Sequence, residues 1–261
     1  MNQIQLDQTD FDFLSANATA AKRLGVGGFI HLDQPIGIWN YIRIANDIAK
    51  QLPHGDVFDW GCGYGQMTYL LKKRGFQVTS FDIGDPNKNS LPDIPICHDL
   101  NVIRNMHPTT LPFAPKSFDA VLSCGVLEHV DEQSQPGNEM KSLSEIGRIL
   151  RPGGILFIYQ LPQLYTWQES IIRRFHLGYA HPRRYTATEI TNMLKQTGYS
   201  VQRIRRANLI PKNLTGMPNK LRTIYSRFSK TLITLDGNLC KVPVLNHIAG
   251  VLEVTAQRNS T

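Results

Sequence analysis

The sequence predicts an α/β protein built on a doubly wound, Rossmann-like and mainly parallel sheet with helices on both faces. Patterns of buried strands alternate with patterns of amphipathic helices, which is typical of βαβ units. The first expected strand, residues 56–60, runs directly into a glycine-rich turn, "GCGYG" at residues 61–65. The next expected strand, residues 76–82, ends in Asp82. Doubly wound sheets bind their ligands at such strand ends.

The remaining elements follow from apolar spacing and from boundary residues. We expect a helix from Trp39 that Pro53 ends, and a helix over residues 66–74 with Gly75 in its C′ position. Residues 1–35 give only weak signals. The other expected elements are strands over residues 94–99, 117–124 and 155–162, a helix over residues 142–154, a helix and a strand within residues 186–209 and a basic helix over residues 219–235.

Composition limits the class of protein. The 261-residue chain is 41% hydrophobic, and no segment is long and apolar enough to span a membrane. The polar, acidic start "MNQIQLDQTDFDF" is unlike a signal peptide. Four scattered cysteines without C-x-x-C pairing favour reduced thiols in a cytoplasmic protein over disulfides or a zinc site, so we expect no metal centre.

The net charge of +7 is unevenly distributed along the chain. Residues 171–230 contain thirteen Lys and Arg against one acid, Glu189, a local balance of +12, which leaves −5 for the rest. This asymmetry indicates either an anionic partner or a solvated basic face.

The spacing of the glycines decides between two cofactor classes. A dinucleotide requires G-x-G-x-x-G, with its pyrophosphate at the helix N-terminus, whereas Gly61, Gly63 and Gly65 follow G-x-G-x-G. Asp59 disfavours a pyrophosphate but suits S-adenosylmethionine (SAM), which carries a sulfonium and an ammonium group. Asp82 can accept hydrogen bonds from ribose hydroxyls in either class. Alternatively, the glycine turn holds no ligand, and Asp82 is an acid at a strand end without a binding role.

Three stretches of the chain resemble class I SAM-dependent methyltransferases: residues 57–82, residues 111–130, which end in "LEHV", and residues 142–158. Over residues 39–161 the chain is similar to the small-molecule enzymes of that family, including those of ubiquinone and menaquinone biosynthesis. The resemblance implies SAM as cofactor and a seven-stranded sheet whose last two strands form a reversed hairpin. It also implies cofactor contacts at Asp59, Gly61, Cys62, Gly63, Gly65, Asp82, Ile83, Asp99, Leu100, Cys124 and Leu127.

Two departures from the family pattern concern Asp99, the implied adenine contact. The link between Asp82 and Asp99 contains three prolines, so a crossover helix there is short or absent. Residues 101–110 are inserted between Asp99 and the motif "LPF".

By the same resemblance, the stretch after the fourth strand, Cys124 to Leu127, would line the methionine end of the cofactor, and Glu128 and His129 would face the acceptor. His129 and His181 are candidate general bases, which matter only if the acceptor loses a proton. The segment "HLGYAHPRRYT" (residues 176–186) combines His, Arg and Tyr side chains that suit an anionic acceptor. We expect substrate contacts at Glu128, His176, Arg183, Arg184 and Tyr185. Alternatively, His129 has only a packing role, and residues 176–186 form a solvated basic loop.

The predicted function is transfer of a methyl group from SAM to a small or lipid-linked acceptor by O-methylation. N- and C-methylation stay open, and the rival functions are an RNA methyltransferase, an inactive cofactor-binding interaction module and an NAD(P)-dependent dehydrogenase. We expect a methyltransferase domain over residues 39–209 with a substrate insertion near residues 163–186. An N-terminal segment (residues 1–38) and a C-terminal extension (residues 210–261), a candidate for completing the sheet, flank this domain.

The expected helix over residues 219–235 is basic and amphipathic. Its apolar face comprises Leu221, Ile224, Tyr225, Phe228, Leu232 and Leu235. This face either packs on the sheet or contacts an anionic membrane. We therefore expect a cytoplasmic protein, with peripheral contact at the inner membrane face as the second alternative for this helix.

Overall fold

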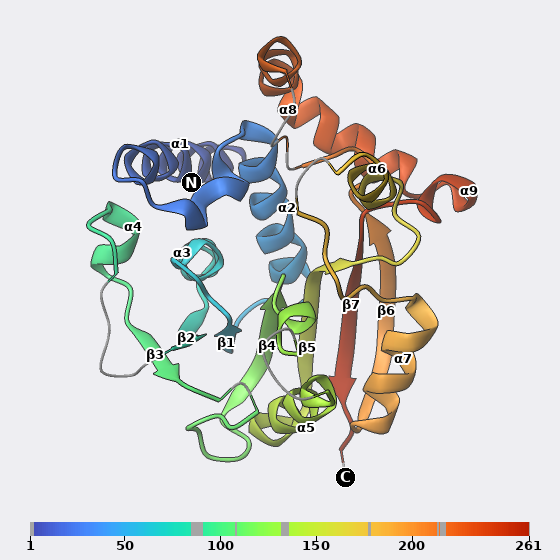
Figure 1. The fold of residues 1–261 in the computed structure, drawn as a ribbon. Helices are drawn as coiled ribbons and strands as arrows, with labels where there is room; N and C mark the ends of the chain where they lie inside the picture. The colour runs from blue at the N-terminus through green and yellow to red at the C-terminus, as the bar shows by residue number, and fades with distance from the viewer. Residues whose placement is uncertain are drawn as a thin grey trace.

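Strand β1 (Asp56–Trp60) is the third strand of a seven-stranded sheet with the order β3-β2-β1-β4-β5-β7-β6 (Figure 1). The structure is a computed structural model that describes residues 3–84, 91–107, 109–131, 136–176, 179–212, 214 and 218–260. The other strands are β2 (Gln77–Ile83), β3 (Val102–Asn105), β4 (Phe118–Cys124), β5 (Leu150–Pro162), β6 (Tyr199–Ala207) and β7 (Val251–Arg258). Of these seven strands, β7 alone runs in the direction opposite to the other six. The predicted fold class and the reversed pairing of the last two strands are confirmed.

Helices cover both faces of the sheet (Figure 1). They are α1 (Gln3–Arg23), η1 (Gly27–Leu32), α2 (Pro35–Gln51), α3 (Gln66–Lys73), α4 (Pro95–His98), η2 (Leu127–His129), α5 (Asn138–Ile149), α6 (Trp167–Phe175), α7 (Ala187–Gln196), α8 (Asn219–Leu239) and α9 (Pro243–Asn246). Side chains of α1, α2 and α3 share one apolar cluster with Val57 of β1, whereas those of α5 and α7 share a second cluster with Phe58. Since neighbouring residues of β1 point to opposite faces, the strand is buried on both sides.

The third strand is not where we predicted it. Residues 94–99 contain the short helix α4 instead, and β3 pairs with β2 inside the segment that we had regarded as an insertion. Pro95 occupies the first turn of α4, and Ile94 packs into the cluster beneath α1. A short apolar run does not distinguish a strand from a buried helical turn. Over the described part of the link, the crossover helix is short, as expected.

The helix predicted over residues 142–154 also ends earlier than expected. Helix α5 stops at Ile149, and β5 begins at Leu150 and continues through the Pro-Gly-Gly sequence. The pairing register between β4 and β5 shifts between Phe118 and Ala120, which accommodates these residues. Pro-Gly-Gly therefore marks a strand irregularity rather than the end of the helix.

Helix α1 falls in the region that gave weak signals. It is mostly polar, and Arg74 fixes it through an ion pair of 2.9 Å to Asp10, whose side chain is fully buried. An ion pair between distant parts of the chain leaves no periodic apolar pattern in the sequence, so local reasoning missed this helix.

Helix α8 was predicted correctly, but its apolar face does not pack on the sheet. Leu221, Ile224, Phe228 and Leu235 are 40%, 55%, 51% and 45% exposed. The helix packs on α2 through another face, where Ser229 is buried and Lys230 lies over the ring of Trp39. Among the described residues, no helix has the length and apolarity needed to cross a membrane.

Candidate active site

The turn between β1 and α3 depends on three glycines in the left-handed region. Gly61, Gly63 and Gly65 have φ angles of 76°, 55° and 84°. A Cβ on Gly61 would lie 2.4 Å from Cγ2 of Val126, and one on Gly65 would lie 2.8 Å from a methyl group of Leu100. Backbone conformation and close packing therefore both require glycine at these two positions.

Gly63 leaves one side of the turn open. A Cβ added there would meet no atom closer than Oε1 of Gln66, at 3.8 Å. The turn itself is fixed, because the backbone amides of Gly61 and Cys62 donate hydrogen bonds of 2.8 and 2.9 Å to the carbonyl of Phe81 at the end of β2. A fixed turn with an open face fits the methionyl part of SAM, which must approach the backbone closely.

Asp59 supplies a buried carboxylate at the end of β1. Its side chain is 2% exposed, and Oδ2 accepts a hydrogen bond of 2.6 Å from Oγ1 of Thr68. Burial raises the pKa of this carboxyl to about 6; the charge of Asp82 acts in the same direction, and the hydrogen bond from Thr68 opposes it. An ammonium or sulfonium group favours the ionised carboxylate, so Asp59 fits a cationic cofactor.

Asp82 lies near the end of β2, beside the glycine turn. Its two oxygens accept hydrogen bonds from the backbone amides of Gly63 (3.1 Å) and Ile83 (2.8 Å). Burial raises the pKa of this carboxyl, whereas the backbone hydrogen bond from Ile83 and the charge of Arg104 lower it. Each oxygen keeps a second lone pair that a ribose hydroxyl can use. The two carboxylates and the open turn therefore fit SAM.

Two other predicted cofactor residues occupy different positions. Leu100 is buried against Cys62 and Val102 and packs beneath Gly65. Asp99 is exposed at the C-terminal end of α4. The structure thus brings Leu100, but not the Asp99 carboxylate, into contact with the glycine turn.

A cavity of about 260 Å³ lies beyond the carboxyl ends of β4 and β5. It shares one loop with the glycine turn, because Cys124 and Gly125 line the cavity whereas Val126 packs against Gly61. Leu127, the next residue, is fully buried. The cavity is lined by His31, Gly37, Asn40, Tyr41, Cys124, Gly125, Glu128, His129, Gln160, Pro162, Thr166, Gln168, Glu169, His181, Asn208, Lys212, Gly250 and Val251.

Both candidate bases line this cavity. Nδ1 of His181 lies 2.5 Å from Oε1 of Glu169, and the ring centres of His181 and His129 are 5.9 Å apart. Nε2 of His129 lies 3.9 Å from Oε1 of the buried Glu128. Glu128, His129 and His181 hold their ligand atoms within 4.8 Å of one another, so these three side chains could also hold a metal ion. Nδ1 of His181 contacts the Glu169 carboxylate, so Nε2 points away from that carboxylate. A general base needs one ring nitrogen in such an orientation to take up a proton.

The arginines and the tyrosine expected to bind an anion have partners within the protein. The Arg183 guanidinium bonds both oxygens of Glu139 at 2.5 and 2.8 Å and lies 2.8 Å from Glu189. Tyr185 is fully buried and donates a hydrogen bond of 2.8 Å to Glu139. Arg184 donates to the carbonyl of Leu164 at 3.2 Å. These contacts support the loop before α7, and Arg183 also lines a second hollow beside Glu128, so the acceptor-binding role stays a prediction.

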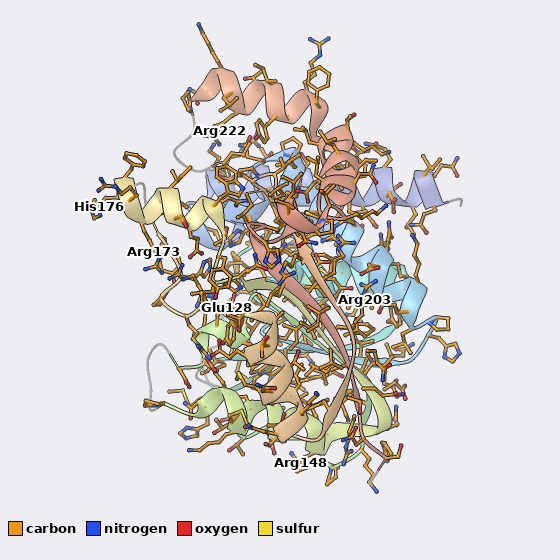
Figure 2. All side chains as sticks on the ribbon, turned by 90° about the vertical axis from the view of Figure 1, so that its right-hand side faces the viewer. Glu128, Arg148, Arg173, His176, Arg203 and Arg222 are labelled. Atoms are coloured by element: carbon orange, nitrogen blue, oxygen red, sulfur yellow. The ribbon has the colours of Figure 1, made fainter. Side chains whose placement is uncertain are left out.

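His176 lies outside the cavity. It caps the exposed C-terminal end of α6 with a φ of 51°, and Figure 2 shows it at the outer end of that helix, away from Glu128. The structure therefore brings His129, His181 and Glu128 together and leaves His176 apart.

Sequence reasoning missed several cavity residues, above all Glu169, Gln160 and Asn208. Gln160 carried a usable signal, because it is a polar residue in the otherwise apolar end of a strand. Glu169 and Asn208 reach the cavity through the packing of α6 and the end of β6, which no local pattern reports.

Comparison with known proteins identifies the central part of the chain. Residues 58–158 match a family model described as a methyltransferase domain. The chain is 28% identical over 162 residues to a protein of Mycolicibacterium smegmatis named "Probable S-adenosylmethionine-dependent methyltransferase", covering 62% of this chain and 57% of the relative. It is 29% identical over 125 residues to the ubiquinone biosynthesis O-methyltransferase of Caulobacter vibrioides, covering 46% of each.

Another relative is named for a different acceptor. The chain is 30% identical over 121 residues to a mouse (Mus musculus) protein named "Probable tRNA methyltransferase 9B", covering 45% of this chain but 24% of that protein. A solved structure from Thermotoga maritima, described as a SAM-dependent methyltransferase and possible histamine N-methyltransferase, has a TM-score of 0.55 at 14% identity, covering 93% of this chain and 97% of that one. The chain thus spans 57%, 46% and 24% of the lengths of these three curated relatives, and the structural likeness concerns the fold.

Proposed function

Since the chain belongs to the class I SAM-dependent methyltransferases, we propose that it transfers a methyl group from SAM to an oxygen of a small or lipid-linked acceptor bound in the cavity. The observation that carries this proposal is the hydrogen-bonded pair of His181 and Glu169 in a cavity that shares the β4–η2 loop with the glycine turn. A base is useful for O-methylation, because a hydroxyl is a poor nucleophile until it loses its proton.

SAM supplies an electrophilic methyl group on a positively charged sulfur. The glycine turn, Asp59 and Asp82 hold the cofactor, and the cavity aligns the acceptor with the methyl carbon. Such alignment contributes about 7–11 kcal/mol when the geometry is near ideal. With SAM bound, the acceptor oxygen would take the methyl group and S-adenosylhomocysteine would leave, while Nε2 of His181 would accept the hydroxyl proton. Glu169 stabilises the resulting imidazolium through Nδ1.

Label transfer tests this function. The protein is incubated with methyl-labelled SAM and a metabolite and lipid extract, and the labelled product is identified. We expect a methyl ether or ester that forms with the parent and much more slowly with His181→Asn. A product methylated on nitrogen or carbon would contradict the O-methylation proposal, and no labelled product would contradict the activity itself.

RNA is the second acceptor to test, because one relative is named as a tRNA methyltransferase. The cavity carries two carboxylates, Glu128 and Glu169, which repel a phosphate backbone at close range. A gel-shift assay with total RNA at physiological salt separates the two acceptors, and tight, salt-resistant binding would favour RNA.

A peripheral contact with an anionic membrane extends the proposal. Helices α6, α8 and α9 lie at the edge of the sheet where the parallel strands end (Figure 1). They expose large apolar side chains, namely Ile171, Phe175, Leu221, Ile224, Phe228, Leu235 and Val244. Exposed cations on or next to these helices are Arg173, Arg174, Lys220, Arg227, Lys230 and Lys241. Apolar side chains among cations are complementary to an anionic lipid surface.

The same helices contribute to the cavity wall. Thr166 and Glu169, at the start of α6, line the cavity. Lys212, another lining residue, forms an ion pair of 3.0 Å with Asp236 of α8. An acceptor with a lipid tail could therefore keep the tail at the membrane while its head enters the cavity.

A further inference from the structure

Two residues of the cavity wall that carry side-chain amides have a backbone conformation that non-glycine residues rarely adopt. Gln160 has a φ of 60° and Asn208 a φ of 61°. Among the described non-glycine residues, two others have positive φ, Lys116 and His176, and neither lines the cavity. Gln160 lies where the register between β5 and β7 shifts, and Asn208 directly follows β6. Strained backbone of this kind persists where the surrounding structure imposes it, and it clusters at functional sites.

The surrounding contacts hold both residues in place. Nδ2 of Asn208 donates a hydrogen bond of 2.8 Å to Oε1 of Gln160. The carbonyl of Asn208 accepts hydrogen bonds from Nε2 of Gln168 (2.5 Å) and from the backbone amide of Gly250 (3.0 Å). A Cβ on Gly250 would lie 2.9 Å from that carbonyl, so the backbones can approach only because this residue is glycine. The result is a fixed pair of amide groups, with one amide bonded to the other.

Two polar atoms on this wall are buried and have no partner in the protein. Asn208 is 6% exposed and its Oδ1 accepts no hydrogen bond, and Thr166 is 1% exposed with Oγ1 unpaired. Thr166 is the N-cap residue of α6, but its hydroxyl makes no capping bond. Both residues line the cavity. A buried polar atom without a partner is unfavourable, so its presence at a cavity indicates that a ligand supplies the partner.

We propose that this wall recognises a hydroxyl-rich ring, such as a sugar or a cyclitol, as the head of the methyl acceptor. The inference rests on the proposed methyltransferase function and names the acceptor class. Each ring hydroxyl donates one hydrogen bond and accepts others, which matches an amide oxygen at Asn208, a hydroxyl at Thr166 and an amide group at Gln160. The acidic side chains Glu128 and Glu169, on the same cavity, accept from further hydroxyls and disfavour an anionic head.

Asparagine and glutamine also read nucleobase edges, so a nucleoside is the competing ligand. The unpaired atoms of this wall come from separate elements, the start of α6 and the segment after β6. Groups spread in this way match hydroxyls around a ring better than they match one planar edge.

Ligand-observed NMR with the S-adenosylhomocysteine-saturated protein tests the inference without requiring turnover. The probes are methyl glycosides of common hexoses, myo-inositol, adenosine, cytidine and catechol. We expect saturation transfer to at least one glycoside or to the cyclitol, and weaker transfer to the nucleosides and to catechol. Stronger transfer to nucleosides or catechol, or no transfer to any hydroxylated ring, would overturn the assignment.

Two variants locate the binding. Asn208→Gly removes the side chain while suiting the positive φ, and Thr166→Val removes the hydroxyl with little change of shape. We expect each to weaken binding of the hydroxylated ring at least tenfold, with unchanged affinity for S-adenosylhomocysteine and with Asn208→Gly melting at or above the parent temperature. Lys116→Gly, at a positive φ that does not line the cavity, controls for relieved strain and should bind like the parent.

The outcomes separate this inference from the proposed function. If Asn208→Gly binds the ring as the parent does, or unfolds at a lower temperature, the side chain is structural and the inference fails. If hydroxylated rings bind but no labelled product forms in the transfer assay, the proposed function fails while the recognition stands.

Discussion

Nδ1 of His181 and Oε1 of Glu169 lie 2.5 Å apart, although they belong to different segments, the loop before α7 and the first turn of α6. Glu169 is 8% exposed, so its carboxylate is held largely out of water beside the imidazole. A carboxylate in this position fixes the orientation of the ring and favours its protonated form. This relationship supports our proposal that His181, rather than the more exposed His129, is the general base.

Substitution of Glu169 by Gln should therefore slow the reaction more than it weakens substrate binding. The amide keeps the shape of the side chain but loses the charge that stabilises the imidazolium. We expect kcat to fall by about 10²-fold, at the lower end of what general base catalysis contributes, with a small change in KM. Steady-state kinetics on the product identified by label transfer measure both. Glu189→Gln, which removes a carboxylate that pairs with Arg183 outside the cavity, is the matched control and should retain kcat.

The glycine turn gives a prediction about stability. Gly61→Ala places a methyl group 2.4 Å from Val126, at a residue whose φ is 76°. Gly75→Ala also has an unfavourable φ, 88°, but its methyl group would contact no other atom. We expect Gly75→Ala to cost about 1–2 kcal/mol in the free energy of unfolding and Gly61→Ala about 1–3 kcal/mol more, since overpacking adds to strain. Urea unfolding measures the difference. Val126→Ala should recover part of the loss in Gly61→Ala; equal losses at the two glycines would show that Val126 moves freely.

The sequence could predict features that depend on neighbouring residues. The left-handed turn at residues 61–65 and the strand that ends near Asp82 follow from glycine spacing and from an apolar run, and both are observed. The pairing of Glu169 with His181 could not be predicted, because it depends on how α6 packs beside the loop that follows it. The partners of Arg183 were misjudged for the same reason: its acids, Glu139 and Glu189, come from α5 and α7.

Asp82 should control cofactor affinity. We expect its carboxylate to accept both ribose hydroxyls while it holds the amides of Gly63 and Ile83. Hydrogen bonds to a charged group contribute about 1.5–3 kcal/mol, so Asp82→Asn should weaken S-adenosylhomocysteine binding by roughly tenfold or more and Asp82→Ala by roughly a hundredfold. Calorimetric titration gives the affinities. Asp93→Ala, which removes an exposed acid paired with His98, is the control, and parent-like affinity of Asp82→Ala would refute the ribose assignment.

Asp59 should make cofactor binding depend on pH. Burial raises the pKa of its carboxyl to about 6, so in the ligand-free protein this group is neutral below that pH. A cationic ligand favours the ionised form, and SAM affinity should therefore rise by up to about tenfold per pH unit between pH 5 and 6 and level off above pH 6. Titration calorimetry from pH 5 to 8 measures this profile, which Asp59→Asn should flatten.

The stability of the ligand-free protein should show the opposite trend. The folded state holds the Asp59 proton more tightly than the unfolded chain, in which this carboxyl has an ordinary pKa of 3.8. The contribution of Asp59 to the free energy of unfolding therefore falls as pH rises from about 4 to 6. The difference in free energy of unfolding between the parent and Asp59→Asn should shift by up to about 3 kcal/mol over that range. A pH-independent difference would mean that Asp59 is ionised throughout.

The exposed face of α8 gives the last prediction, on membrane contact. Ile224 and Phe228 are 55% and 51% exposed and lie one helical turn apart, so they can enter the interface of a bilayer together. Each cation near an anionic lipid surface adds about 1 kcal/mol, and salt screens this attraction. In flotation assays we expect the protein to be recovered with phosphatidylserine-containing vesicles, less with neutral ones, and less again at high salt. The double variant Ile224→Ser, Phe228→Ser should bind about tenfold more weakly, whereas Ile4→Ser, which alters an even more exposed side chain of α1, should bind like the parent. Equal recovery with neutral and anionic vesicles, or none with either, would mean that this face does not contact an anionic membrane.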